Sequence, residues 1–180
     1  ADTSSSKIGA AMQEEENLMR TGRYTIRIRR VDPQLDTAAL RHAFPGVHFD
    51  PVGAGDHVPV AENKIRTIKD RCRVIGQALP YPLPDSLMTD LVRYVVSRLN
   101  NEVQEGEERS PRQKFTGQKP NYKRDYALKF GDYCEVYQKS NDQLLNSTDR
   151  ARTVPAIALR PTGNSNGSWE FYTIKNKQTS

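Results

Sequence analysis

The chain has 180 residues, enough for one good-sized domain or for one medium and one small domain. Hydrophobic residues make up only 36% of it, so the composition predicts a modest core with polar extensions. The formal net charge of +5 and the isoelectric point of about 9.2 favour acidic partners such as nucleic acid.

The cysteine count and the hydropathy pattern exclude several kinds of site. Two cysteines, Cys72 and Cys134, are too few for a zinc site of the Cys-His type. Cys72 falls on an apolar helical stripe, which predicts a buried thiol rather than a reactive one. No segment reads as a signal peptide or a membrane span, so we expect an intracellular protein, in the nucleus or cytoplasm, without a membrane partner.

The first part of the chain alternates helical and strand patterns. Residues 7–20 read as a helix that ends near Gly22, and residues 24–31 as a strand that ends at Asp32 before a proline. Residues 35–44 read as a short helix and residues 47–52 as a second strand. A long helix follows, and this order predicts a parallel strand pair with crossover helices, hence an α/β layer.

A glycine-rich loop and a long amphipathic helix run from Val52 to Leu79. Apolar residues recur along the helix at steps of three and four, at Ile65, Ile68, Cys72, Ile75 and Leu79. Another face carries Glu62 in the first turn and then the cations Arg66, Lys69 and Arg73, with Lys64 nearby. This spacing fits a solvated charged face. The sharper alternative is a helix whose first turn holds a metal and whose cations lie along a polyanion.

A second long helix is predicted at residues 86–100, after a proline-rich turn in which Asp85 is the expected N-cap. Its apolar positions are expected to pack against the stripe of the preceding helix; they are Met88, Leu91, Val92, Val95 and Leu99. Residues 101–109 are polar and carry four glutamates, which predicts a solvated linker.

Residues 110–124 combine basic and aromatic side chains, which are Arg112, Lys114, Phe115, Lys119, Tyr122, Lys123 and Arg124. Cations beside aromatics suit a nucleic-acid strand through phosphate contacts and stacking. An extended connector anchored by its aromatics explains the pattern as well. Short strand patterns at 126–138, 153–160 and 169–174 then predict a small antiparallel β-barrel with Trp169 in its core.

Four stretches resemble the integrase region of copia-like retroelement polyproteins. They are GAGDHVPVAENKIRTIKDR, YPLPDSLMTDLVRYVVSRLN, FTGQKPNYKRDYALKFGDYCEVY and RTVPAIALRPTGNSNGSW, and the resemblance extends roughly from Lys7 to Tyr172. It implies a partial RNase H-like integrase core over residues 1–100, a polar and basic linker over 101–124, and an SH3-like barrel over 125–176.

The resemblance also implies DNA integration, that is, strand transfer by metal-assisted phosphoryl transfer in the parent polyprotein. By the match of motifs, Asp32 and Glu62 would be catalytic carboxylates that hold Mg²⁺ or Mn²⁺. Without the resemblance, Asp32 reads as a turn residue before proline. The family's loop before the last acidic residue flanks the active site, so Gly53, Gly55 and His57 are expected near it.

The first acidic residue of the family's triad has no counterpart here. It stands on an opening strand, with two more strands before the first helix, and Asp2 is too close to the helix at Lys7 for that. We therefore expect a fragment that lacks the first catalytic strand, with another chain or a homo-oligomer as one source of the missing strands. The alternative function is that of a non-catalytic DNA- or RNA-binding or scaffold protein derived from a retroelement.

We predict that this polypeptide alone has no strand-transfer or nuclease activity. Two carboxylates leave most of a metal's coordination to water, so the ion would bind weakly and be poorly placed for phosphoryl transfer. The test is a DNA cleavage and joining assay with Mg²⁺ or Mn²⁺. Turnover that disappears in Glu62→Gln would contradict the prediction.

Overall fold

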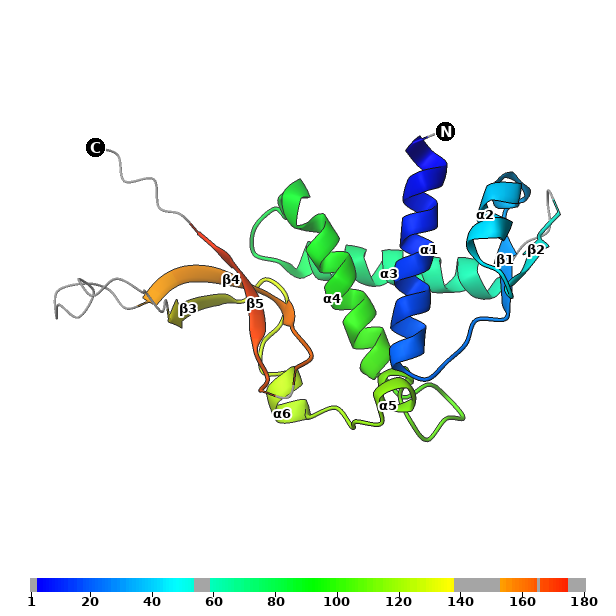
Figure 1. Ribbon diagram of the computed structural model, residues 1–180. Coiled ribbons are helices and arrows are strands. Elements are labelled where there is room, and N and C mark those ends of the chain that lie inside the picture. The colour runs from blue at the N-terminus through cyan, green and yellow to red at the C-terminus, as the bar shows by residue number, and fades with distance from the viewer. Residues whose placement is uncertain (1–2, 54–58, 138–152, 165, 175–180) are drawn as a thin grey trace, which may run out of the picture. The chain divides into compact units, whose positions relative to one another are not determined.

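The computed structural model describes residues 3–53, 59–137, 153–164 and 166–174 (Figure 1). The chain forms two compact units, an N-terminal unit, Ala1–Ile65, and a C-terminal unit, Arg66–Ser180. The division between the two units falls between Ile65 and Arg66, within helix α3 (Pro59–Ala78). The sequence analysis instead places domain boundaries at residues 100 and 124.

The N-terminal unit has the order helix, strand, helix, strand, as predicted. Its elements are α1 (Thr3–Thr21), β1 (Ile28–Val31), the 3-10 helix η1 (Pro33–Leu35), α2 (Ala38–Ala43) and β2 (His48–Pro51). Strands β1 and β2 are parallel, with Ile28 opposite His48 and Val31 opposite Pro51. The parallel pair is therefore confirmed, although β1 begins four residues later than its sequence pattern does.

One small core holds this unit together. Its buried members are Val31, Leu40, Phe44 and Phe49, against which Met12, Leu35 and Val47 pack. Helix α2 begins at a side-chain cap, where Thr37 Oγ1 accepts from the Leu40 amide at 3.3 Å. Arg41 donates two hydrogen bonds of 2.6 Å to Asp36, and this guanidinium lowers the pKa of the Asp36 carboxyl.

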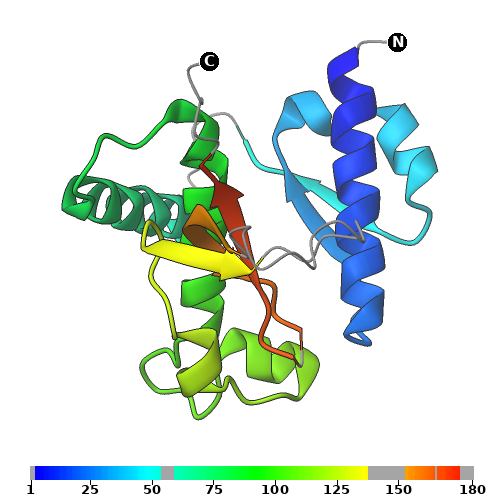
Figure 2. The same ribbon diagram turned by 90° about the vertical axis from the view of Figure 1, so that its left-hand side faces the viewer.

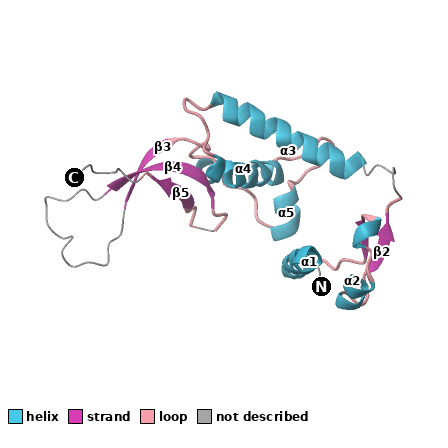
Figure 3. Cartoon of the chain, turned by 90° about the horizontal axis from the view of Figure 1, so that it is seen from above, coloured by secondary structure: helices cyan, strands magenta, loops and turns pink. Residues whose placement is uncertain are grey.

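The C-terminal unit combines helices with an antiparallel sheet (Figures 2 and 3). Beyond α3, its helices are η2 (Asp85–Leu87), α4 (Met88–Asn101), α5 (Pro111–Thr116) and α6 (Tyr122–Asp125). The sheet has the order β3–β4–β5, formed by β3 (Tyr133–Tyr137), β4 (Thr153–Pro161) and β5 (Trp169–Thr173). The last two strands agree with their predicted ranges within one residue.

The described strands of this unit form an open sheet and not the closed barrel that the sequence analysis predicted. Residues 126–132, expected to begin the first strand, instead form turns after α6, so β3 is only five residues long. Three short strands cannot close, because closure requires enough strands to curl the sheet onto itself. Residues 138–152, between the first two predicted strands, lie outside the described residues.

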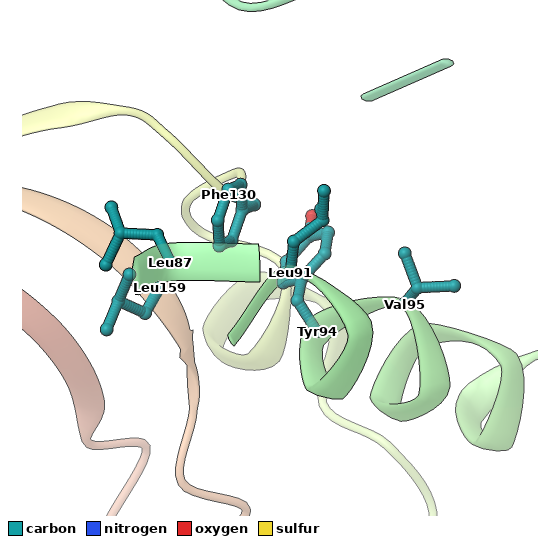
Figure 4. Close-up of a cluster of buried hydrophobic side chains, with 6 residues drawn as sticks. All are labelled: Leu87, Leu91, Tyr94, Val95, Phe130 and Leu159. Carbon is teal, nitrogen blue, oxygen red and sulfur yellow. The ribbon is translucent and has the colours of Figure 1, made fainter. Parts of the chain in front are cut away.

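The predicted packing between the two long helices is confirmed in part. Figure 4 shows the central cluster, which consists of Leu87, Leu91, Tyr94, Val95, Phe130 and Leu159. Four predicted stripe residues of α3 pack against it, namely Ile68, Cys72, Ile75 and Leu79. Burial raises the pKa of the Cys72 thiol, which keeps it protonated and agrees with an unreactive cysteine.

Two details of the second helix were wrong. Met88 and Val92 are 45% and 38% exposed, while Tyr94 and Arg98 are buried in their place. The predicted N-cap Asp85 lies inside η2, and α4 begins after Leu87 without a side-chain cap. The buried face of α4 therefore carries Leu91, Tyr94, Val95 and Arg98, and it continues Leu87 of η2. These residues keep the predicted helical spacing, but the buried face is rotated about the helix axis from the predicted one.

Arg98 connects three parts of the C-terminal unit. Its guanidinium donates to the carbonyls of Asp125 and Leu128, each at 3.0 Å. The same group lies 3.9 Å from the ring centre of Tyr126, 4.7 Å from that of Tyr94 and 6.0 Å from that of Trp169. One buried side chain of α4 therefore ties the segment after α6 and the first residue of β5 to the helix.

We predict that Arg98→Ala destabilises the C-terminal unit by roughly 3 kcal/mol, because two carbonyls lose their donor and the stacked rings lose their partner. Urea unfolding followed by the fluorescence of Trp169, the single tryptophan, reports on this unit. The matched control is Arg93→Ala on the same helix, whose side chain is 57% exposed and 3.7 Å from Asp90. A loss no larger than the control's would contradict the role of Arg98.

Candidate metal site and nucleic-acid interface

Asp32 follows β1 directly and lies at the carboxyl end of the parallel pair. Strands that run parallel end at the same edge of their sheet, and the Val52 amide donates to the Val31 carbonyl at 2.9 Å there. The segment that leads from β2 toward α3 therefore starts beside Asp32. Gly53 is exposed in that segment, whereas Gly55 and His57 lie outside the described residues.

Asp32 also has a structural role. It is the N-cap of η1, and its Oδ1 accepts a hydrogen bond of 2.9 Å from the Gln34 amide. The interpretation of Asp32 as a turn residue before proline is thus confirmed. A carboxylate has two oxygens, so a cap made through Oδ1 leaves the metal hypothesis open.

Glu62 lies in the first turn of α3 and is exposed. Its position places a carboxylate at the positive end of the helix dipole, as expected. Two other carboxylates of the N-terminal unit are paired with arginines: Asp36 with Arg41, and Asp50 with Arg30 at 3.4 Å.

The donor chemistry of Asp32 and Glu62 fits a hard cation such as Mg²⁺, which prefers oxygen ligands and retains water. Among the described residues, no group of three His, Cys, Asp or Glu side chains is placed to hold a metal ion. At most two protein carboxylates of the described chain would therefore hold the ion, and water would complete its coordination.

The predicted basic face of α3 is exposed. Lys64, Arg66, Lys69 and Arg73 all face solvent, while the stripe from Ile68 to Leu79 packs on the core. Arg73 lies 2.7 Å from Asp70, but both side chains are more than half exposed, so this pair is weak. The helix thus presents cations on a side that its own core packing does not use.

Arg71 is a cation of α3 that the sequence analysis did not single out. It donates two hydrogen bonds, of 2.5 and 2.8 Å, to Glu102, which follows α4. This bidentate pair joins the middle of α3 to the C-terminal end of α4 within the C-terminal unit. The predicted solvated linker at 101–109 is therefore attached to the core at its first glutamate.

The segment 110–124 is helical in two places rather than extended. Ser110 caps α5 by accepting from the Gln113 amide at 3.2 Å, Pro111 follows as the first helical residue, and Gly117 ends the helix at φ 74°. Asn121 caps α6 in the same way. These Ser-Pro, Gly and Asn signals are present in the sequence and identify both helices.

The five predicted cations of this segment fall into two groups. Arg112 donates to the Gly163 carbonyl at 2.7 Å, and Arg124 lies 3.2 Å from the buried Asp125 and covers Gly167 so closely that a Cβ there would clash with it. Both arginines hold the turn between β4 and β5. The other three are exposed; they are Lys114, which pairs with Glu107 at 2.5 Å, Lys119 and Lys123.

No family model, curated protein or solved structure matches this chain. In the part of the chain that the structure describes, none of the helices combines the length and the apolar character needed to cross a bilayer. The integrase resemblance consequently rests on the sequence stretches quoted above, and the function drawn from it is a proposal.

We predict weak Mn²⁺ binding that depends on both carboxylates. Mn²⁺ should broaden the amide signals of Gln34 and Asn63 in an NMR titration, and Asp32→Asn or Glu62→Gln should reduce the broadening. Asp32→Asn keeps the cap of η1, because asparagine caps as well as aspartate, whereas Asp32→Ala costs about 1 kcal/mol of stability. Glu14→Gln on the exposed side of α1 is the control. Equal broadening in all variants would show that the two carboxylates share no ion.

Proposed function

We propose that this chain is an integrase fragment of a retroelement polyprotein that binds nucleic acid and, in its parent protein, takes part in metal-dependent strand transfer. In this proposal, the helix and parallel-strand layer of the N-terminal unit belongs to an RNase H-like core. The antiparallel sheet β3–β4–β5 belongs to an SH3-like module. The order of elements is consistent with both assignments, and the sequence resemblance is their basis.

The observation that carries the proposal is the exposed basic face of α3. Arg66, Lys69 and Arg73 lie on one face of a single helix, beside its apolar stripe, so their spacing is set by the backbone. Regularly spaced cations suit the regularly spaced phosphates of a nucleic acid, and such contacts release counterions whatever the base sequence is. We therefore expect binding with little sequence preference.

Asp32 and Glu62 have the second role in this proposal. Mg²⁺ or Mn²⁺ supplies charge stabilisation at the attacking and leaving oxygens of a phosphodiester. The chain's own contribution is to hold the ion by two carboxylate oxygens and to hold the nucleic acid along α3, which begins at Glu62's turn.

The alternative function is a non-catalytic nucleic-acid-binding or scaffold protein. The observation that favours it is that the described residues supply two candidate carboxylates and no third metal-binding side chain beside them. The two functions differ in one measurable property. Binding that is unchanged by Mg²⁺ and by Glu62→Gln indicates the binding protein, whereas metal-dependent binding indicates the integrase.

We predict that binding to DNA weakens steeply with salt and that the cations of α3 cause much of this dependence. Replacing Arg66, Lys69 and Arg73 together by Gln should reduce the slope of log K against log salt by about 2, at about 0.7 to 0.9 per lost phosphate contact. Fluorescence anisotropy with a labelled duplex, at several salt concentrations, measures the slope.

The matched control also removes three exposed cations, Lys7, Arg20 and Arg93, from other helices. It lowers the net charge equally, so a slope that falls as much as in the α3 variant would reject a specific basic face. Within 110–124, Lys119→Gln with Lys123→Gln should reduce the slope further. Arg112→Gln should instead lower stability, because Arg112 is bonded to the β4–β5 turn.

A further inference from the structure

Three exposed tyrosines of the C-terminal unit differ in the charges beside them. Tyr133 and Tyr137 are 65% and 67% exposed on β3, and Glu135 lies between them on the same face of the strand. The Tyr133 hydroxyl donates to Glu135 at 2.7 Å, so a carboxylate stands beside this ring. Tyr122 is 56% exposed at the start of α6, where the exposed charged residues are lysines. Of these three rings, Tyr122 is the one whose surroundings suit an anionic ligand.

The turn that presents Tyr122 is bonded at both of its ends. Asn121 caps α6, and the buried Asp125 carboxylate accepts from the Asn121 amide at 3.0 Å. The Trp169 indole donates to the Arg124 carbonyl at 3.3 Å, which fastens the turn to the start of β5 (Figure 1). A ligand that binds Tyr122 therefore meets a backbone that is already ordered, so binding loses little conformational entropy.

The Tyr122 ring is the outermost member of a stack. Its centre lies 5.2 Å from that of the Tyr126 ring at an interplanar angle of 39°, and the Arg98 guanidinium lies 3.9 Å from the Tyr126 ring centre. Tyr126 thereby supports Tyr122 from within the unit, while more than half of Tyr122 stays accessible. A ring held in this way offers a flat surface to another aromatic group.

Two lysines flank Tyr122 in the chain. Lys119 and Lys123 are both exposed, and the ion pairs of this segment are made by Lys114 and Arg124 instead. A nucleotide joins a flat base to a phosphate, which is the combination that a ring beside ammonium groups accepts. A proline-rich peptide also packs on tyrosine rings, but it brings no anion for the lysines. A base inside a duplex is stacked on both sides, so the ligand must be an unpaired base.

We propose that Tyr122, with Lys119 and Lys123, is a stacking site for an unpaired base of a single nucleic-acid strand. The base lies on the exposed side of the Tyr122 ring, and the adjoining phosphates face the lysines. This inference rests on the proposed nucleic-acid function and adds the class of strand that residues 110–124 take. It assigns the stacking to Tyr122 and not to Phe115, which is half-buried.

The test compares two fluorescent strands of equal length, oligothymidylate and an abasic oligonucleotide, by anisotropy with the full chain. Both carry the same phosphates, but only oligothymidylate can stack. The unmodified chain should bind oligothymidylate about tenfold more tightly, and Tyr122→Ala should remove most of this difference while changing abasic binding less than about twofold. Tyr122→Phe keeps the ring and should stay within about threefold of the unmodified chain.

The matched control is Tyr133→Ala, which removes a similarly exposed ring that stands beside a carboxylate. It should leave the binding of both strands unchanged. Lys119→Gln with Lys123→Gln should weaken both strands and lower the slope of log K against log salt by about 1.4, at about 0.7 per phosphate contact on a single strand. Tyr122→Ala removes no charge and should leave that slope unchanged.

Three results would overturn the inference. One is equal binding of the two strands by the unmodified chain, and another is equal weakening of both strands by Tyr122→Ala. The third is a loss in Tyr133→Ala as large as that in Tyr122→Ala. The proposed function is measured separately, with a duplex whose bases are all paired. Duplex binding without a preference for oligothymidylate over the abasic strand therefore rejects the stacking site alone, whereas the opposite pair of results rejects the duplex interface of α3 alone.

Discussion

The C-terminal unit depends on one buried cation. Arg98 projects from α4 among three aromatic rings and satisfies two backbone carbonyls of a segment that has little regular structure of its own. A buried guanidinium is costly unless its donors are used, and here the carbonyls of Asp125, at the end of α6, and of Leu128 use them. The same segment holds Asp125, whose carboxylate accepts from the Asn121 amide at 3.0 Å and from Arg124 at 3.2 Å. Arg98 thereby fixes where α6 and the start of β5 lie against α4.

Several of the chain's arginines make internal contacts and do not contribute to a basic surface. A net charge of +5 suggests a uniformly basic surface, but several arginines are internal connectors. Arg71 joins α3 to Glu102, Arg112 and Arg124 hold the β4–β5 turn, and Arg29 packs over Phe44 with its Nε buried. Every lysine that the structure describes is exposed, and its compact ammonium is more strongly hydrated than a guanidinium. An electrostatic interface on this protein is consequently smaller than its composition indicates.

The N-terminal unit places its candidate metal site on one small sheet. The carboxyl edge of this sheet carries Asp32 and leads toward Glu62. A two-stranded parallel sheet has few ladder bonds, so its stability rests on the packing of its own Val31 and Phe49 against Leu40 and Phe44.

The sequence by itself determined the helices and strands whose apolar pattern is regular and bounded by clear start and stop signals. Both long helices, the parallel pair and the last two strands follow from apolar spacing and from Gly and Pro punctuation, and so does the exposure of the basic face of α3. It also located Asp32 and Glu62 at element ends, although whether they share an ion stays a prediction. Only the tertiary structure decided the buried register of α4, the open form of the β3–β4–β5 sheet and the division of arginines between core and surface. The physical reason is that an arginine's role depends on which carbonyls and rings reach it. For Arg98, both carbonyls and two of the three rings come from residues 27 to 71 positions further along the chain.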